Sequence, residues 1–179
     1  MKFTEEEIKD LYYIELSSYK DERGYLKRNI CLNELEQNKI PFGEVKQSNL
    51  SYNAKAKTLR GFHYQSEPNL EKKIISCLKG SIHNIVIDLR KESKSFLKWK
   101  SFLISEKKEN AILVPEGCAN AFLTLEDHTS VLYFHSEFYN PSSYKSMNYN
   151  DKQFNFDWPH APMVISNKDK KAPFYETNK

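Results

Sequence analysis

The 179-residue sequence has only three cysteines and no long hydrophobic run. The cysteines, Cys31, Cys77 and Cys118, are odd in number and form no CxxC pair, so neither a disulfide framework nor a zinc site is predicted, and we expect them to be buried small hydrophobes. No apolar stretch approaches the roughly 18 to 20 residues of a membrane span. The N-terminus also turns acidic where a signal peptide would be apolar. These absences predict a cytoplasmic protein with no membrane partner.

Charge of one sign and metal-ligand motifs are also lacking. The 27 Lys and Arg residues nearly balance the 24 Asp and Glu residues, and the basic ones are scattered, so nucleic acid is not an expected partner. None of the five histidines forms an HxH or HxxH pair, and Walker and GxSxG motifs are absent. Acid–base chemistry without a metal or cofactor remains open, as does plain ligand binding.

The residues that are present indicate a single all-β domain over residues 1–179. Hydrophobic residues make up 39% of the chain, enough for one core. Short runs rich in Val, Ile, Leu, Phe and Tyr recur from about residue 46 to 134, a spacing typical of an antiparallel sandwich or barrel. Two short helices are expected near the N-terminus, one after the Thr4–Glu7 capping box and one at Asn33–Glu36. The expected strands are 73–78, 82–89, 99–104, 111–114, 119–125 and 130–135.

The position of Gly80 and the composition of the two ends of the chain refine this predicted arrangement. The runs on either side of Gly80 predict a hairpin that places Lys73 and Asn84 on one face, within side-chain reach. Residues 1–15 are expected to form an N-terminal arm. The segment from about 139 to 179 is rich in Asn, Ser, Pro and Asp but keeps several aromatics, so we expect it to pack back over the barrel.

The densest polar cluster lies within residues 59–65. It holds a fixed cation, Arg60, and a titratable imidazole, His63, although a lone histidine is more often a satisfied core residue. His83 and His135 occupy strand positions without evident partners. Tyr133 fits either a core aromatic or a phenol that faces a cavity. Residues 166–169, which end in Asp169, match an ordinary polar turn or helix cap.

Eight short motifs follow one another along the chain: DERG (21–24), QSNLS (47–51), LRGFHYQ (59–65), CLKG (77–80), IDLR (87–90), VPEG (114–117), FDWP (156–159) and SNKD (166–169). Their order resembles that seen in the dTDP-4-dehydrorhamnose 3,5-epimerases, and the resemblance covers about residues 15–175. It implies a cupin-type antiparallel β-jelly-roll with short peripheral helices, usually a homodimer. It also implies that the protein epimerises a nucleotide-diphosphate-linked 4-keto-6-deoxy sugar without a metal or coenzyme.

The resemblance also implies roles for individual residues. His63 would be the base, Asp169 the carboxylate that orients its imidazole, Lys73 the stabiliser of an enolate oxygen and Tyr133 the proton donor. The positions that match substrate-binding positions of the family are Arg23 for the diphosphate, Gln47 and Asn49 near the nucleoside and phosphate, Arg60, Asn120 and Tyr139.

Three positions depart from the family pattern. Asn120 stands where histidine is usual, Asn84 where aspartate is usual, and Arg28 where glutamate is usual in a segment near the nucleoside. This combination resembles the branch that acts on GDP-linked 4-keto-6-deoxy-heptoses, so the nucleotide is left open between dTDP and GDP. Two further alternatives are a non-catalytic sugar-nucleotide-binding jelly roll, favoured by Asn84 and Asn120, and a 3,4-ketoisomerase on the same fold.

Overall fold

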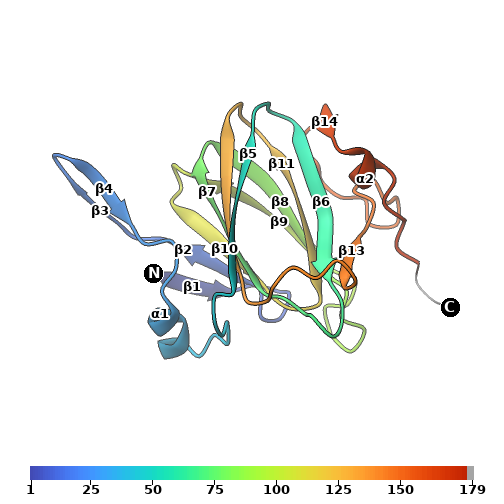
Figure 1. Ribbon diagram of the computed structural model, residues 1–179, viewed down its shortest axis with the longest axis horizontal. Helices are drawn as coiled ribbons and strands as arrows, with labels where there is room; N and C mark the ends of the chain where they lie inside the picture. The colour runs from blue at the N-terminus through green and yellow to red at the C-terminus, as the bar shows by residue number, and fades with distance from the viewer. Residues whose placement is uncertain (177–179) are drawn as a thin grey trace.

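The chain folds into two facing antiparallel sheets, seen in the computed structural model, which describes residues 1–176 (Figure 1). The first sheet has the order β1-β2-β10-β7-β12-β5 and the second the order β13-β6-β11-β8-β9, with β14 paired in parallel to β6. The strands of the first sheet are β1 (Lys2–Glu5), β2 (Tyr12–Glu15), β10 (Asn110–Val114), β7 (Lys73–Lys79), β12 (Thr129–His135) and β5 (Gln47–Asn53). Those of the second are β13 (Tyr144–Ser146), β6 (Thr58–Gln65), β11 (Cys118–Thr124), β8 (Ser81–Asp88), β9 (Trp99–Ser105) and β14 (Val164–Ile165). The predicted all-β jelly roll is confirmed.

All six predicted strands are present, with ends that differ by at most one residue from the expected ranges. These strands could be predicted because one face of each enters a core, so apolar residues recur at every second position. Ile82 and Val86 of β8 are examples. Strands of lower apolar content were not predicted. Among them are β5, which is largely exposed, and β6, which carries the polar cluster.

The predicted hairpin around Gly80 is wrong, although the turn itself is there. β7 pairs with β10 and β12 in the first sheet, whereas β8 pairs with β9 and β11 in the second. Gly80, at φ +76°, therefore carries the chain from one sheet to the other. A short turn between two buried strands looks the same in sequence whether the strands pair or separate, so periodicity alone gave the wrong partner.

The helix expected after Thr4 is also wrong. Residues 2–5 form β1, in which Phe3 lies opposite Ile14 of β2. The following loop closes with a hydrogen bond from the Leu11 amide to the Ile8 carbonyl and buries both side chains. An acidic segment can match the capping-box pattern without forming a helix, so the match is a weak signal. Here the chain forms a turn that buries Ile8 and Leu11 in place of a helix. The second helix is confirmed as α1 (Leu32–Gln37).

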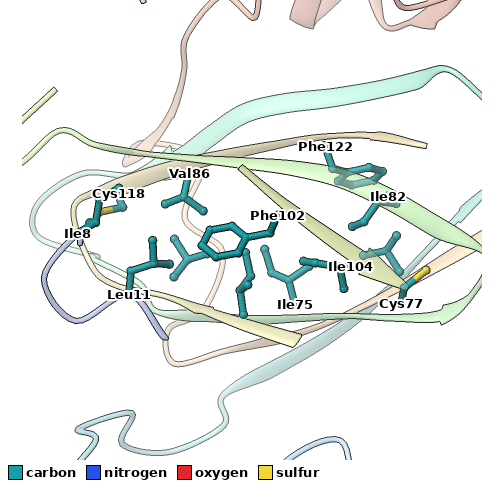
Figure 2. Packing of buried hydrophobic residues seen from close by; sticks show 13 residues of the cluster. Ile8, Leu11, Ile75, Cys77, Ile82, Val86, Phe102, Ile104, Cys118 and Phe122 are labelled. Atoms are coloured by element: carbon teal, nitrogen blue, oxygen red, sulfur yellow. The ribbon is translucent and has the colours of Figure 1, made fainter. Parts of the chain in front are cut away.

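Three hydrophobic clusters hold the layers together. The central one lies between the sheets, where Ile75 and Cys77 of β7 face Ile82, Val86 and other residues of the second sheet (Figure 2). A second cluster fills the space between α1 and the outer face of the first sheet. The third covers the outer face of the second sheet with the C-terminal segment, whose members include Met147, Phe154, Phe156, Trp158 and Tyr175. The burial of Cys77 and Cys118 matches their expected role as small hydrophobes, whereas Cys31 is half-buried.

Two peripheral elements complete the fold. A two-stranded hairpin of β3 (Ser18–Asp21) and β4 (Gly24–Lys27) projects away from both sheets, as Figure 1 shows. The second short helix, α2 (Asn167–Lys170), is capped by the Ser166 hydroxyl, which accepts a hydrogen bond from the Asp169 amide at 3.0 Å. Within residues 1–176, no helix is long and apolar enough to cross a membrane.

Candidate active site

A cavity of about 260 Å³ opens between the two sheets and collects most of the predicted site residues. One wall comes from β6 and β11 of the second sheet, and the other from β5, β7 and β12 of the first. Its lining residues are Gln47, Asn49, Leu50, Ser51, Arg60, His63, Glu71, Lys73, Asn120, Tyr133, His135, Tyr139 and Tyr144. A larger cavity of about 580 Å³ beside α1 is mostly apolar and holds only Glu36 and Lys39 as charged lining groups.

His63 and Asp169 form an imidazole–carboxylate pair across 106 residues of sequence. His63 Nε2 lies 2.8 Å from Asp169 Oδ1, and the other carboxylate oxygen is 3.5 Å from the Gly61 amide. Burial alone would raise the pKa of Asp169, but the hydrogen bond and charge of His63, together with hydrogen bonds from Gly61 and Ser166, outweigh it and the pKa is lowered. The charged carboxylate fixes Nε2–H on His63 and leaves Nδ1 as the nitrogen able to accept a proton.

A bulge brings Arg60 and His63 to the same wall of the cavity. Residues three apart on a regular strand point to opposite faces. Here Arg60 lies opposite Phe122 and His63 opposite Asn120, so the register shifts by one residue between them. Gly61, at φ +112°, occupies the bulge. Arg60 is further fixed by its Nε, which donates to Asn53 Oδ1 at 2.8 Å.

Lys73 points into the space between the sheets and is 5% exposed. Its ammonium donates to the His63 carbonyl oxygen at 3.1 Å and to Asn120 Oδ1 at 3.2 Å. A third contact, 3.1 Å long, joins it to the Glu71 carboxylate. A buried ammonium requires a counter-charge, and Glu71 supplies it.

Asn84 does not provide that counter-charge, and the expected contact with Lys73 is wrong. Asn84 lies opposite Phe102 on β9 and Phe122 on β11. It is fully buried, and both atoms of its amide lack a hydrogen-bond partner among residues 1–176. The misplacement follows from the hairpin error, because β7 and β8 lie in different sheets.

Tyr133 enters the cavity from the first sheet, whereas His63 enters from the second. It also packs against the central core cluster, so both sequence interpretations hold. Burial raises the pKa of its phenol, and the nearby positive charge of Arg60 partly opposes that rise. The phenol is therefore protonated at neutral pH and able to donate.

Among the predicted binding residues, Arg23 alone does not line the cavity, whereas the other five do: Gln47, Asn49, Arg60, Asn120 and Tyr139. Gln47 Oε1 accepts a hydrogen bond from the Tyr139 amide at 3.1 Å, which ties β5 to the segment that follows β12. Arg23 lies at the tip of the projecting β3–β4 hairpin, is exposed and pairs with Asp21.

Sequence reasoning missed three titratable lining residues, Glu71, His135 and Tyr144, besides Leu50 and Ser51. The interpretation of His135 as unpartnered is wrong, because its Nδ1 lies 2.9 Å from Glu71 Oε2. Its spacing of two from Tyr133 on one strand was the available signal. Tyr144 lies 5.4 Å from the His63 ring, between ring centroids, and has the ammonium of Lys168 3.9 Å above its own ring.

A jelly roll that holds these groups in one pocket defines a class of protein: a cupin-type barrel equipped for proton transfer to and from a bound small molecule. The family description "dTDP-4-dehydrorhamnose 3,5-epimerase" matches residues 5–177 of the chain. The dTDP-4-dehydrorhamnose 3,5-epimerase of Salmonella typhimurium is 31% identical, with 94% of this chain and 92% of that protein covered.

Two solved structures are similar over nearly the whole chain. The Bacillus anthracis dTDP-4-dehydrorhamnose 3,5-epimerase with TDP and pyrophosphate bound has a TM-score of 0.93 at 32% identity, over 97% of this chain and 99% of that one. A Legionella pneumophila epimerase in complex with dTDP-4-keto-L-rhamnose has a TM-score of 0.91 at 29% identity, over 97% and 92%. The chain belongs to the dTDP-4-dehydrorhamnose 3,5-epimerase family.

Proposed function

We propose that this protein is an isomerase that inverts C3, C5 or both in a nucleotide-diphosphate-linked 4-keto-6-deoxy sugar. The observation that carries the proposal is that an imidazole paired with a carboxylate and a protonated phenol enter one cavity from opposite sheets. Inversion of a carbon needs a base on one face and an acid on the other, and His63 and Tyr133 supply them.

The ketone at C4 makes the hydrogens at C3 and C5 acidic. His63 removes one of them through Nδ1, and Asp169 stabilises the resulting imidazolium. The electron pair moves into an enolate whose oxygen carries the developing negative charge. Lys73 and Arg60, both fixed by hydrogen bonds before substrate arrives, stabilise that charge. Tyr133 then returns a proton from the opposite face.

Two nucleotides are candidates. The similar proteins named above are described with TDP or a dTDP-linked sugar, which supports dTDP. Arg28, which stands where the family usually has glutamate, supports GDP because it reverses a charge in the segment that the resemblance places near the nucleoside. Arg28 pairs with Glu34 in the fold and stays about half exposed, so its guanidinium is accessible to a ligand.

We further propose that the protein works as a homodimer in which Arg23 contacts the diphosphate bound by a second copy. Arg23 does not line the cavity of its own chain, and the hairpin that carries it exposes Tyr19, Tyr25 and Leu26. A projecting hairpin with exposed apolar residues fits an interface. Light scattering should give a dimer mass, and Arg23→Ala should raise KM more than it lowers kcat. A monomer with full activity would rule this arrangement out.

The experiment is incubation with dTDP- and GDP-linked 4-keto-6-deoxy sugars in deuterated water, followed by NMR of the products. An epimerase adds one deuterium at each inverted carbon, and the preferred nucleotide reacts faster. Migration of the ketone identifies a 3,4-ketoisomerase instead. Tight binding of both nucleotides without exchange identifies a non-catalytic sugar-nucleotide-binding protein.

A further inference from the structure

The cavity holds a second imidazole–carboxylate pair, separate from His63 and Asp169. His135 of β12 places Nδ1 2.9 Å from Glu71 Oε2, and both residues line the cavity. Their side chains are only 11% and 10% exposed, so water screens the pair weakly. His135 lies in β12 and Glu71 just before β7, both strands of the first sheet. His63 and Asp169 lie in β6 and α2.

Glu71 uses its two oxygens for two different partners. Oε2 faces His135, and Oε1 lies 3.1 Å from the Lys73 ammonium. Burial alone would raise the pKa of Glu71, but the hydrogen bond from His135 and the charge of Lys73 outweigh it, so the pKa is lowered. Glu71 is therefore a carboxylate that joins the imidazole of one residue to the ammonium of another.

The ammonium of Lys73 has three N–H donors, and three acceptors surround it. The acceptors are the His63 carbonyl, Asn120 Oδ1 and Glu71 Oε1. Only Glu71 carries a negative charge. Its loss would leave a buried cation with neutral partners, a state that favours the uncharged amine or a displaced side chain.

His135 is itself held on two sides, which allows it to orient Glu71. Its Nε2 lies 3.3 Å from Asn49 Nδ2, and its ring stacks on Tyr133 with centroids 5.8 Å apart and planes 19° from parallel. With Nε2 accepting from Asn49, Nδ1 carries the proton that it donates to Glu71. The hydrogen bond from His135 thus holds Oε2 of Glu71, and Oε1 of the same carboxylate is directed at Lys73.

We propose that Glu71 and His135 are a positioning pair for Lys73: Glu71 holds the ammonium charged at the cavity wall, and His135 holds Glu71. The kinetic consequence of this pairing rests on the proposed function, in which Lys73 stabilises an enolate, so the pair acts on turnover more than on substrate binding.

The kinetic test compares Glu71→Gln and Glu71→Asp, with and without Lys73→Met. Glu71→Gln should lower kcat about 10- to 100-fold with KM changed less than about threefold, and Glu71→Asp should recover part of the loss. In the Lys73→Met background, Glu71→Gln should cost less than about twofold, because the pair acts through Lys73. Independent losses that multiply would overturn the proposal.

A second test needs no substrate. Acetic anhydride labels only neutral amines, and mass spectrometry reports the rate at Lys73 relative to exposed lysines of the same sample. Glu71→Gln should speed labelling of Lys73 about fivefold or more, and His135→Gln should act in the same direction. An unchanged rate in both variants, with thermal unfolding showing that they are folded, would contradict the proposal.

The chain offers a matched control. His83 Nε2 lies 3.1 Å from Asp157 Oδ1 in another imidazole–carboxylate pair, and neither residue lines the cavity. His83→Gln should leave both kcat and Lys73 labelling unchanged. If the unaltered protein failed to exchange deuterium with either nucleotide sugar, the proposed function would fall, while the labelling rates would still decide whether Glu71 and His135 hold Lys73.

Discussion

Gly61 of β6 lies so close to Asn120 of β11 that a Cβ at position 61 would be 2.6 Å from the Asn120 carbonyl oxygen and 2.7 Å from the Ala121 Cα. Both are main-chain atoms that cannot rotate away. This contact lies in the bulge between the Arg60–Phe122 pair and the His63–Asn120 pair. The same bulge brings Arg60 and His63 to one face. The close approach of the two backbones therefore sets the wall of the cavity that carries the proposed base.

Gly61→Ala should lower the free energy of unfolding by about 2 to 4 kcal/mol and reduce kcat strongly, because backbone strain adds to a clash that must move β6. Denaturant unfolding and steady-state kinetics measure the two effects. Gly43→Ala is the control: Gly43 also has a positive φ, of +84°, but nothing lies within 4 Å of its added Cβ. Equal losses in the two variants would show that strain alone, and not the approach to Asn120, matters.

Asp169→Asn tests the pair that activates the base. The amide keeps the shape but loses the charge that fixes the His63 tautomer and stabilises its imidazolium. We expect kcat to fall by about 10²- to 10⁴-fold with little change in KM. Ser166→Ala, which removes the cap of α2 and one weaker contact to Asp169 but keeps the carboxylate, should cost about tenfold at most. Activity within threefold of the parent in Asp169→Asn would contradict the assigned role.

Much of the fold was readable because six strands carry clear alternation, and the strands on either side of Gly80 were placed correctly along the chain. Their pairing was not readable. Gly80 joins two sheets rather than two paired strands, and that choice depends on contacts with β10, β11 and β12, which lie far away in sequence. Local pattern reports which face of a strand is buried, and it does not report the neighbour.

Asn84→Leu should stabilise the protein. The Asn84 amide is buried beside Phe102 and Phe122 with neither polar atom paired among the described residues. Replacement by an apolar side chain of similar size removes an uncompensated desolvation cost and should raise the free energy of unfolding by about 1 to 3 kcal/mol.

The matched control for that substitution is Asn53→Leu. Asn53 is equally buried, but its amide bonds to Arg60 Nε and to the Thr129 carbonyl. Its loss should lower the free energy of unfolding, by about 1 to 3 kcal/mol. Both values come from urea denaturation, and a destabilised Asn84→Leu variant would show that the Asn84 amide is satisfied in solution.

Because of Asp88, we expect the free energy of unfolding to fall in acid. It is fully buried and accepts hydrogen bonds from Arg90 Nε at 2.8 Å and Ser95 Oγ at 2.7 Å. Burial raises the pKa of Asp88, but its hydrogen bonds, led by Arg90, outweigh that and lower it from 3.8 to about 2. The unfolded chain therefore binds this proton first on acidification.

The resulting stabilisation, about 2 kcal/mol, is fully present above about pH 4 and is lost as the pH falls to about 2. Urea denaturation across this range measures it. Asp88→Asn should be less stable at pH 7 and should lack that part of the acid dependence. An identical pH slope in the variant and the parent would exclude Asp88 as the source.

The candidate site was recovered from sequence only in part. His63 stood out in the polar cluster of residues 59–65, but the roles of Lys73, Tyr133 and Asp169 came from resemblance to a family, since nothing local joins His63 to a carboxylate 106 residues away. Glu71 and His135 were missed because they come together only in the folded protein. Their contact forms where the residues just before β7 lie beside the end of β12. Arg23 was found as a motif, yet its place on a projecting hairpin depends on the fold.

The central claim is that His63 is the base and Tyr133 the opposing acid, and deuterium counting at C3 and C5 tests it most directly. With the preferred nucleotide sugar in deuterated water, the parent protein should add one deuterium at each inverted carbon. His63→Asn should abolish exchange at both carbons, whereas Tyr133→Phe should retain exchange and slow inversion. Full exchange by His63→Asn, or none by the parent with either the dTDP- or the GDP-linked substrate, would contradict the account.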